Sequence, residues 1–435
     1  MEVAAVTPVR PEPGTGHDHP LAPVVRRDLD VARVKKDFPL LERVVHGKRL
    51  VYLDSASSSQ KPLAVLDTMD RYYTTTHANV HRGVYQIAQE ATELYESARA
   101  KVARFVGAGD PGEIVFTKNV TEAINLVAYS WGRHNLGPGD VVVTSELEHH
   151  ADFVPWLQLR EEKGAELRIL RLRPDGTLDL DNLDQVLDGA KLLAITAASN
   201  VLGTLPPLRR LVGAAHDAGA LVLVDAAQYV PHQSADVRQI GADFLGFTGH
   251  KMLGPTGIGV LWARRELLED MPPFLTGGEM IRDVRFDGFT TNDVPWKFEA
   301  GTPPIAEAVG LGAAVDYLEA LDMGAVREHE RALTAYAIEA LKARYGSALV
   351  VHGPPQPEPR AGIVSFTYKD VHAHDLSQVL DEAGVCVRAG HHCAKPLMRY
   401  LGVSATARAS FYIYNDEADV DALVDAIGQS DTLFG

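Results

Sequence analysis

From residue 50 to residue 262, short apolar runs alternate with stretches that have the spacing of helices. This alternation constrains the fold most, because apolar runs buried on both faces and followed by helices form βαβ units and a mostly parallel sheet. The predicted strands are residues 50–53, 113–116, 140–144, 167–172, 191–197, 220–224, 244–247 and 259–262, and the helices between them include residues 121–131, 151–163 and 207–219. Ligands of such sheets bind outside the carboxyl ends of the strands, so polar residues at these ends are candidate site residues.

The rest of the chain predicts further units. Residues 1–27 are rich in proline, glycine and alanine without periodicity, and they are predicted to form a disordered tail. We expect residues 28–49 to pack with a small domain, residues 50–304 to form the large domain and residues 305–435 to form the smaller α+β domain. Helices are predicted at 305–321, 325–345, 375–383 and 417–429, and strands at 362–367 and 385–388. The irregular segment 271–302 is long for a structureless connection, which usually signals function.

Charge and cysteine content narrow the class of protein. The formal net charge of −16, from 42 basic and 58 acidic residues, disfavours nucleic acid and anionic membranes as partners. No apolar run approaches the ~18–20 residues of a membrane-spanning helix. Two cysteines in 435 residues cannot make a disulfide framework, so a reducing compartment is expected. The cytoplasm is the predicted location.

A lysine and an acid follow two of the predicted strands. Lys251, in a glycine-rich loop after residues 244–247, has the position of a lysine that forms a Schiff base with pyridoxal phosphate (PLP), although alone it would be taken as a surface lysine. Asp225 can face the pyridine nitrogen, whose proton makes PLP an electron sink, although an aspartate after a strand is often a helix cap. Gln228 is placed to donate to the ring hydroxyl.

Other polar groups gather at the same predicted edge. Thr121 lies where a strand runs into a helix, whose free N–H groups make a phosphate site, and plain N-capping accounts for this pattern equally well. Thr248 and His250 are candidates for the same phosphate. His149 suits stacking on a flat ring better than metal binding, because no cluster with zinc-ligand spacing accompanies it. Asn200 follows the strand 191–197.

The last motif is a loop that holds Cys393 beside Arg388 and two histidines. Nearby positive charge favours the nucleophilic thiolate, although a buried structural cysteine is the commoner case. Cys386 lies between two valines and is predicted to be core packing. Arg408 is a candidate to clamp a substrate carboxylate, with a surface arginine as the alternative.

Taken together, these motifs resemble the fold-type I PLP enzymes of the aminotransferase class V group, and more narrowly the group II cysteine desulfurases of SUF iron–sulfur cluster assembly. The matching stretches are residues 54–62, 78–83, 120–125, 148–151, 224–228, 249–251, 298–303 and 388–393. The resemblance implies an α/β large domain, with a mostly parallel seven-stranded sheet flanked by helices, and a smaller α+β domain. Serine is common in the family where this chain has Thr248, and the hydroxyl is kept.

The resemblance also implies a role for each candidate residue. Lys251, Cys393 and His149 would be catalytic, with Cys393 taking the sulfur of L-cysteine as a persulfide while alanine leaves. The cofactor would be held by Thr121, His149, Asp225, Gln228, Thr248, His250 and Lys251, joined by Thr302 from the partner subunit of a homodimer. The substrate would be bound by Asn200, Arg388 and Arg408, with His81 and Arg82 near the site at the dimer interface. No metal site is expected.

Two alternatives stay open at this point. A selenocysteine lyase, or another β-eliminating class V enzyme, could use the same residues on L-selenocysteine. A PLP-free scaffold protein for assembly partners is disfavoured by the intact set of Lys251, Asp225 and His149. The resemblance implies a dedicated sulfur acceptor of SufE or SufU type, and the sequence does not decide between the two.

Overall fold

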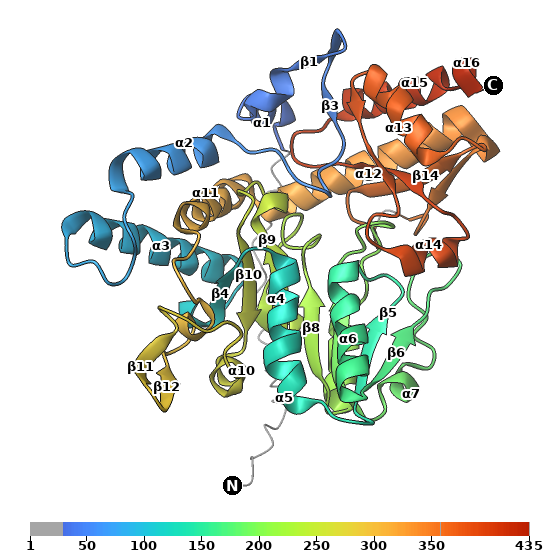
Figure 1. Ribbon diagram of the computed structural model, residues 1–435. Coiled ribbons are helices and arrows are strands. Elements are labelled where there is room, and N and C mark those ends of the chain that lie inside the picture. Colours follow the sequence, from blue (N-terminus) through green and yellow to red (C-terminus); the bar gives the residue numbers. More distant parts are fainter. Residues whose placement is uncertain (1–28, 357, 435) are drawn as a thin grey trace, which may run out of the picture.

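A seven-stranded sheet lies at the centre of the computed structural model, which describes residues 29–356 and 358–434 (Figure 1). The predicted tail, 1–27, lies outside the described residues. The strands are β4 (Ile114–Thr117), β5 (Val141–Ser145), β6 (Glu166–Leu170), β7 (Ala190–Thr196), β8 (Leu221–Asp225), β9 (Phe244–Thr248) and β10 (Gly259–Ala263). Their order is β4-β10-β9-β8-β7-β5-β6, and β10 is antiparallel to both neighbours while the other pairs are parallel. The predicted fold class is confirmed.

Helices cover both faces of this sheet, which explains why its strands are continuously apolar. Along β8, Val222 and Val224 pack into one core cluster while Leu223, between them, packs into another. The second cluster includes residues of α4 (Val120–Leu126) and α6 (Val154–Lys163), which lie side by side in front of the sheet in Figure 1. The first cluster includes residues of α3 (Gln86–Phe105), α8 (Leu208–Asp217) and α11 (Ile305–Leu321).

The first predicted strand does not join the main sheet. Residues 50–53 contain only the short strand β3 (Val51–Tyr52), which pairs in parallel with β15 (Val385–Cys386). Val51 and Leu53 pack into a third core cluster, together with Val385. An apolar run shows that a strand is buried, but it does not show which strand lies beside it, so the prediction of its sheet was wrong.

The C-terminal unit has an antiparallel sheet of its own. The strand order is β13 (Leu349–His352), β14 (Ile363–Tyr368), β17 (Thr406–Ser410) and β16 (Arg388–Gly390). Its helices are α12 (Met323–Tyr345), α13 (Ala373–Glu382), α14 (Lys395–Leu401) and α15 (Glu417–Gln429). The predicted strand 385–388 is divided between β15 and β16, which belong to different sheets.

Segments at both ends of the predicted small domain make long-range contacts. The helix α11 packs against α2 (Leu63–Arg71) and α3. In the N-terminal segment, Lys35 and Arg49 form ion pairs with Asp419 of α15 at 3.1 and 2.6 Å. The shorter elements are α1 (Val31–Lys35), β1 (Val44–Val45), β2 (Lys48–Arg49), α5 (Arg133–Asn135), α7 (Leu183–Leu187), α9 (Val237–Ile240), α10 (Arg265–Asp270) and α16 (Asp431–Phe434). The domain boundaries stay a prediction.

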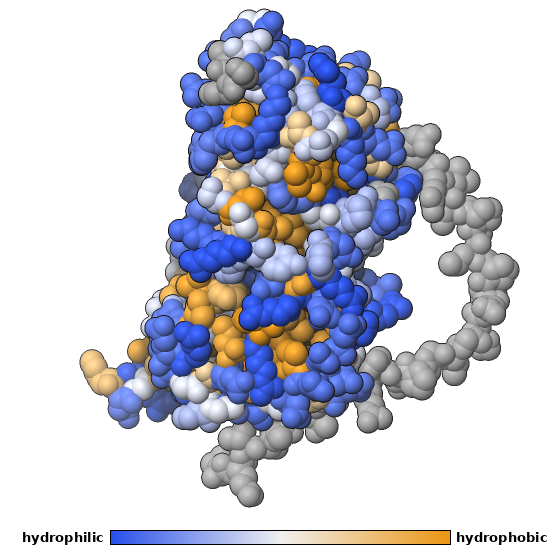
Figure 2. Space-filling model, turned by 90° about the vertical axis from the view of Figure 1, so that its right-hand side faces the viewer, coloured by the Kyte–Doolittle hydropathy of each residue, from blue (hydrophilic) through white to orange (hydrophobic). Residues whose placement is uncertain are grey.

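The surface carries both hydrophilic and hydrophobic residues. Figure 2 shows hydrophilic residues interspersed with patches of hydrophobic ones over the face at the right of Figure 1. None of the helices in the described part of the chain combines the length and apolar character needed to cross a membrane.

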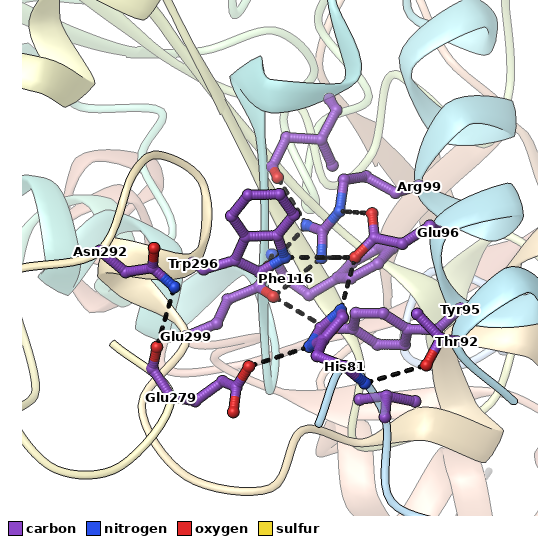
Figure 3. A network of polar contacts seen from close by, with 12 residues as sticks. His81, Thr92, Tyr95, Glu96, Arg99, Phe116, Glu279, Asn292, Trp296 and Glu299 are labelled. Carbon is purple, nitrogen blue, oxygen red and sulfur yellow. Dashed lines mark hydrogen bonds and ion pairs between the residues drawn. The ribbon is translucent and has the colours of Figure 1, made fainter. Parts of the chain in front are cut away.

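The segment 271–302 contains the hairpin β11 (Ile281–Arg285) and β12 (Gly288–Thr291), and a buried ion pair anchors its far end (Figure 3). Arg99 of α3, 1% exposed, donates from Nη1 and Nη2 to the two carboxylate oxygens of Glu299 at 2.7 and 2.9 Å. Tyr95 and the backbone N–H of Phe116 donate to the same carboxylate at 2.9 and 2.7 Å. This pair therefore joins α3, β4 and the end of the segment.

We predict that Arg99→Met lowers the free energy of unfolding by about 3–5 kcal/mol, because it leaves the Glu299 carboxylate buried without a countercharge. The control is Arg104→Met, which breaks an exposed pair with Glu319 and should cost less than about 1 kcal/mol. Urea denaturation of both variants measures the difference. Equal losses in the two variants would contradict the assignment.

Candidate active site

One pocket lies at the carboxyl ends of β7 and β8. Its lining consists of Val120, His149, Thr196, Ala198, Asn200, Asp225, Ala227, Gln228 and Lys251. Five of these, His149, Asn200, Asp225, Gln228 and Lys251, are predicted site residues. The structure therefore brings together side chains that follow four different strands.

Asp225 ends β8 at the floor of the pocket. It is 3% exposed, it lies opposite Thr196 in the β7–β8 register, and its Oδ1 accepts a hydrogen bond from the N–H of Ala227 at 3.0 Å. Burial raises the pKa of the Asp225 carboxyl, while the Ala227 hydrogen bond and the charge of Lys251 act in the opposite direction. An acid in this setting is suited to pair with a positively charged group in the pocket.

Lys251 lies in the 3-10 turn Gly249–Lys251, which follows β9 directly. The turn needs a glycine at its start, because a Cβ on Gly249 would lie 2.7 Å from Cγ2 of Ile258. Burial lowers the pKa of Lys251 to about 8; the charge of Asp225 opposes this shift and Arg408 adds to it. The amine therefore loses its proton more readily than an ordinary lysine, as a nucleophilic lysine must.

His149 caps the 3-10 turn His150–Asp152 beside Lys251. Its Nδ1 accepts from the N–H of Ala151 at 3.0 Å, which places the ring proton on Nε2. Burial, and then the charge of Lys251, lowers the pKa of His149 to about 3. The ring is therefore neutral at physiological pH, and a neutral flat ring can stack on a cofactor.

Three buried polar atoms around the pocket have no hydrogen-bond partner among the described residues: Oε1 of Gln228, Oδ1 of Asn200 and Nε of Arg408. The other amide atoms are engaged, since Nε2 of Gln228 donates to the carbonyl of Ala56 at 2.6 Å and Nδ2 of Asn200 donates to that of His392 at 2.7 Å. Buried polar groups are normally paired. These side chains, with the Lys251 amine and the Asp225 carboxylate, fit a polar, anionic cofactor and its substrate.

Arg408, on β17, is 3% exposed and reaches the pocket edge from the C-terminal unit. Its Nη1 donates to the carbonyl of Asn200 at 2.7 Å, and its Nη2 donates to Ser57 at 2.7 Å and to Asp54 at 3.3 Å. Burial lowers the pKa of the guanidinium, which Asp54 partly offsets. Arg388 pairs directly with Arg408 across β16 and β17, so both side chains project from one face of the sheet, with Arg388 exposed.

The loop with Cys393 is docked against the turn that carries His149. The backbone N–H of His150 donates to the carbonyl of Cys393 at 2.7 Å, and Nε2 of His150 accepts from the N–H of Lys395 at 3.0 Å. His392 and Cys393 adopt φ values of 50° and 55°. The Cys393 residue is half-buried, and its charge acts on the pKa of Lys251 and of Arg408, so the thiol lies near both cations.

Cys386 has a different environment. It lies in β15 opposite Tyr52 and is half-buried. Burial, and then the charges of Asp381 and Asp54, raises the pKa of the Cys386 thiol. It is therefore a poorer source of thiolate than an ordinary cysteine.

The predicted phosphate residues lie around the pocket and are not part of its lining. Thr121 is exposed in the first turn of α4, where the neighbouring Val120 lines the pocket and Asn119 caps the helix by accepting from the N–H of Glu122 at 3.0 Å. Thr248 is buried at the end of β9, and only Gly249 separates it from His250 along the chain. Burial, and then the charge of Lys251, lowers the pKa of His250 to about 4. Thr302 is exposed between Trp296–Phe298 and α11.

His81 and Arg82 belong to another cluster. His81 contacts Glu96 at 2.8 Å and Glu279 at 3.1 Å (Figure 3). Arg82 forms an ion pair with Glu279 at 3.1 Å. Although burial lowers the pKa of His81, its hydrogen bond with Glu96 and the two carboxylates raise it overall. The structure thus places both residues before α3, in contact with Glu96 of α3 or with Glu279 of the segment 271–302, and outside the pocket lining.

Sequence reasoning missed several residues at the site. Thr196 and Ala198 line the pocket at the end of β7, and the strand end itself was the available signal. Lys61, whose pKa burial lowers to about 8, contacts the carbonyls of Ser59 and His250. Two buried acids, Glu148 and Asp152, lie behind the pocket. Their hydrogen-bond partners, Ser145 and Trp156, are close along the chain, but the sequence does not show that both acids are buried.

A parallel α/β sheet with a lysine and an aspartate facing each other at its carboxyl edge defines a class of protein, the fold-type I PLP enzymes. The chain matches the aminotransferase class-V family over residues 51–423. A probable cysteine desulfurase of Streptomyces coelicolor is 50% identical over 413 residues, which cover 94% of this chain and 98% of that protein.

Two solved structures of cysteine desulfurases are similar to this chain in fold and sequence. The apo cysteine desulfurase of Thermococcus onnurineus is 40% identical, with a TM-score of 0.87 over 92% of this chain and 97% of that one. The cysteine desulfurase CsdA of Escherichia coli is 41% identical, with a TM-score of 0.86 over 94% of this chain and 100% of that one. The chain belongs to the aminotransferase class-V family, and this membership implies PLP as its cofactor. The predicted family and cofactor are confirmed.

We predict that Lys251 of the apoprotein reacts with trace acetic anhydride with a midpoint near pH 8, because only the neutral amine reacts and the pKa is lowered to about 8. Ordinary lysines, with a pKa of about 10.4, should still be gaining reactivity above that pH. Mass spectrometry of the peptides gives both profiles, with the exposed Lys118 for comparison. A Lys251 midpoint near that of ordinary lysines would contradict the burial argument.

Proposed function

We propose that this protein is a PLP-dependent cysteine desulfurase that converts L-cysteine to L-alanine and keeps the sulfur on Cys393. The observation that carries the proposal is the docking of the Cys393 loop on the turn of His149 and His150, beside Lys251 and Asp225. A thiol and an amine nucleophile then share one site. That pairing suits an enzyme that first activates a sulfur compound and then removes its sulfur.

The proposed cofactor contacts follow from the lining. Lys251 would bind PLP covalently and move protons, Asp225 would hold the proton at the pyridine nitrogen, and His149 would cover the ring. Gln228 would contact the ring hydroxyl, and the phosphate would be held by Thr121, Thr248 and His250, with Thr302 contributed by the partner subunit. When bound, PLP supplies an electron sink for the substrate's Cα.

The proposed substrate contacts lie on the side of the C-terminal unit. Neither the guanidinium Nε of Arg408 nor the amide oxygen of Asn200 has a hydrogen-bond partner within residues 29–356 and 358–434, so both can engage the carboxylate and amine of an amino acid. Arg388, on the same sheet face, adds positive charge at the entrance. His81 and Arg82 are proposed to act from the subunit interface.

In the sulfur-transfer step, the Cys393 thiolate attacks the sulfur of L-cysteine. An S–S bond forms as the Cβ–S bond of the substrate breaks, and the electron pair of that bond is taken up by the substrate carbon skeleton, which is protonated to alanine. The product on the protein is a persulfide. Overall, L-cysteine and the enzyme thiol give L-alanine and the enzyme persulfide, without an external oxidant.

We further propose that the persulfide is passed to an acceptor of SufE or SufU type for iron–sulfur cluster assembly, and that the enzyme is a cytoplasmic homodimer. The exposed apolar side chains Val84, Tyr85 and Ile87, which are 91%, 54% and 45% exposed, support a subunit contact near His81. Two free cysteines support a reducing compartment. Sedimentation of the holoenzyme tests the dimer.

The two cysteines give a matched pair of variants. We predict that Cys393→Ala still binds PLP and L-cysteine but gains no sulfur, because no other thiol lies in the docked loop. Cys386→Ala should keep persulfide formation and lose about 1 kcal/mol of stability, as small truncations do. Intact mass after incubation with L-cysteine measures one added sulfur. Its persistence in Cys393→Ala, with loss in Cys386→Ala, would reverse the assignment.

We predict that Asp225→Asn keeps PLP but turns over L-cysteine at least ~100-fold more slowly, because an amide cannot hold the pyridinium proton as a carboxylate does. The control is Asp243→Asn. Asp243 directly precedes β9, its carboxylate is fully buried and pairs with Arg264, and it is not part of the pocket lining. Alanine release per bound PLP is the measurement. Turnover of Asp225→Asn equal to that of the control would mean that another acid performs this role.

A further inference from the structure

Two buried carboxyl groups near Asp225 form no ion pair with any residue in the described part of the chain. Glu148, directly before His149, is 2% exposed, and Asp152, at the end of the 3-10 turn His150–Asp152, is 0% exposed. The two side chains lie at one turn, close enough that each acts on the pKa of the other. A buried carboxylate normally has a cation or several donors, so this pair needs an explanation.

The hydrogen bonds of the four carboxyl oxygens of Glu148 and Asp152 show which of them lack a donor. Oε1 of Glu148 accepts from the hydroxyl of Ser145 at 2.5 Å, and Oδ1 of Asp152 accepts from the indole N–H of Trp156 at 3.0 Å. The remaining oxygens, Oε2 of Glu148 and Oδ2 of Asp152, are buried and have no well-aligned donor among the described residues, although the backbone of Thr196 acts on the Glu148 carboxyl and lowers its pKa. Two ionised carboxylates cannot hydrogen-bond to each other, because neither has a proton to donate. One proton between these two oxygens satisfies both.

The surrounding charges favour that proton. The negative charge of Asp225 acts on both Glu148 and Asp152, whereas the charge of Lys251 acts on Asp225. Burial, and to a lesser extent the charge of Asp225, raises the pKa of Glu148 to about 8, although hydrogen bonding by Ser145 and Thr196 opposes this shift. Burial, and then the charges of Glu148 and Asp225, raises the pKa of Asp152.

The elements that pack most extensively against this turn are α4, α6 and β7, and the Cys393 loop is also docked on it. In that loop, His391 and Lys395 act on the pKa of His150, and neither forms an ion pair with Glu148 or Asp152 among the described residues. The one titratable residue of α4, Glu122, lies 3.9 Å from Lys118. The charged residues of α6 lie in its second half, and Lys191 of β7 lies at the opposite end of its strand from Thr196. His149, on the turn itself, is neutral because burial lowers its pKa to about 3.

We propose that Glu148 and Asp152 share one proton at neutral pH and act as a positioning pair that keeps a single negative charge behind Asp225 while fixing the turn of His149. The role of this pair rests on the proposed function in one respect, namely that Asp225 is the residue that faces the cofactor. A pair without the proton would put three negative charges in one buried region. A pair without charge would leave Asp225 as the only negative group facing the cofactor.

The test uses amide variants of the holoenzyme, Glu148→Gln and Asp152→Asn. In each, an amide N–H replaces the shared proton and the remaining carboxylate keeps the single negative charge. The infrared carbonyl band of a buried protonated carboxylic acid, present in the wild type at neutral pH, should be absent from both single variants. Asp419→Asn removes a buried carboxylate paired with Lys35 and Arg49, and it should leave the band in place.

The second readout is the pH midpoint of the visible absorbance of bound PLP, which a merely structural role would not move in this pattern. Both single variants should keep the wild-type midpoint, because the charge near Asp225 is unchanged. The double variant, Glu148→Gln with Asp152→Asn, removes that charge and should lower the midpoint by about one pH unit or more, since a cation loses a stabilising neighbour.

Two results would overturn the proposal. A carboxylic acid band that persists in both single variants places the proton elsewhere. A midpoint that falls in each single variant shows that the wild-type pair carries two negative charges. Either single variant suffices if the other does not fold. Neither readout depends on release of sulfur or alanine, so failure of the desulfurase assignment would show separately, in the Cys393→Ala assay.

Discussion

The buried guanidinium of Arg408 holds together three segments that are far apart along the chain. Arg408 lies on β17 of the C-terminal unit. Its guanidinium donates to Ser57, which follows β3, and to the carbonyl of Asn200, which follows β7. A buried cation must keep its acceptors, because losing one leaves a charge without solvation in the interior. The contact between the sheet edge and the C-terminal unit, where the pocket lies, therefore depends on this group.

The position of the thiol follows from the same contact. The Asn200 residue that accepts from Arg408 donates from its side chain to the carbonyl of His392, and the next residue is Cys393. On the other side, His150 fixes the carbonyl of Cys393. The cysteine is thus held between the loop after β7 and the turn after β5. Its distance from Lys251 is set by backbone and amide contacts, and not by contacts of the thiol itself.

Local patterns predicted the elements and residues that depend on short stretches of sequence. Strands such as β8 are apolar throughout because both faces are covered, and Asp225 and Lys251 stand at strand ends that such runs mark. Strand β17 was missed because its inward residues, Ala407 and Ala409, are small and give no apolar signal.

Features that depend on tertiary contacts could not be predicted in the same way. The pairing of β3 with β15 exists only once distant segments meet. Thr302 is proposed to complete the site of a partner subunit, so a single chain cannot show its role.

The backbone of the thiol loop has a consequence for sulfur delivery. His392 and Cys393 both adopt left-handed backbone conformations, each of which costs a non-glycine residue of order 1–2 kcal/mol and persists only where surrounding contacts enforce it. We therefore expect the backbone of this loop to keep the thiol in one position. In the proposed mechanism, the sulfur on Cys393 would then stay beside the pocket where the enzyme took it up. The acceptor would have to bring its own thiol or metal to that point.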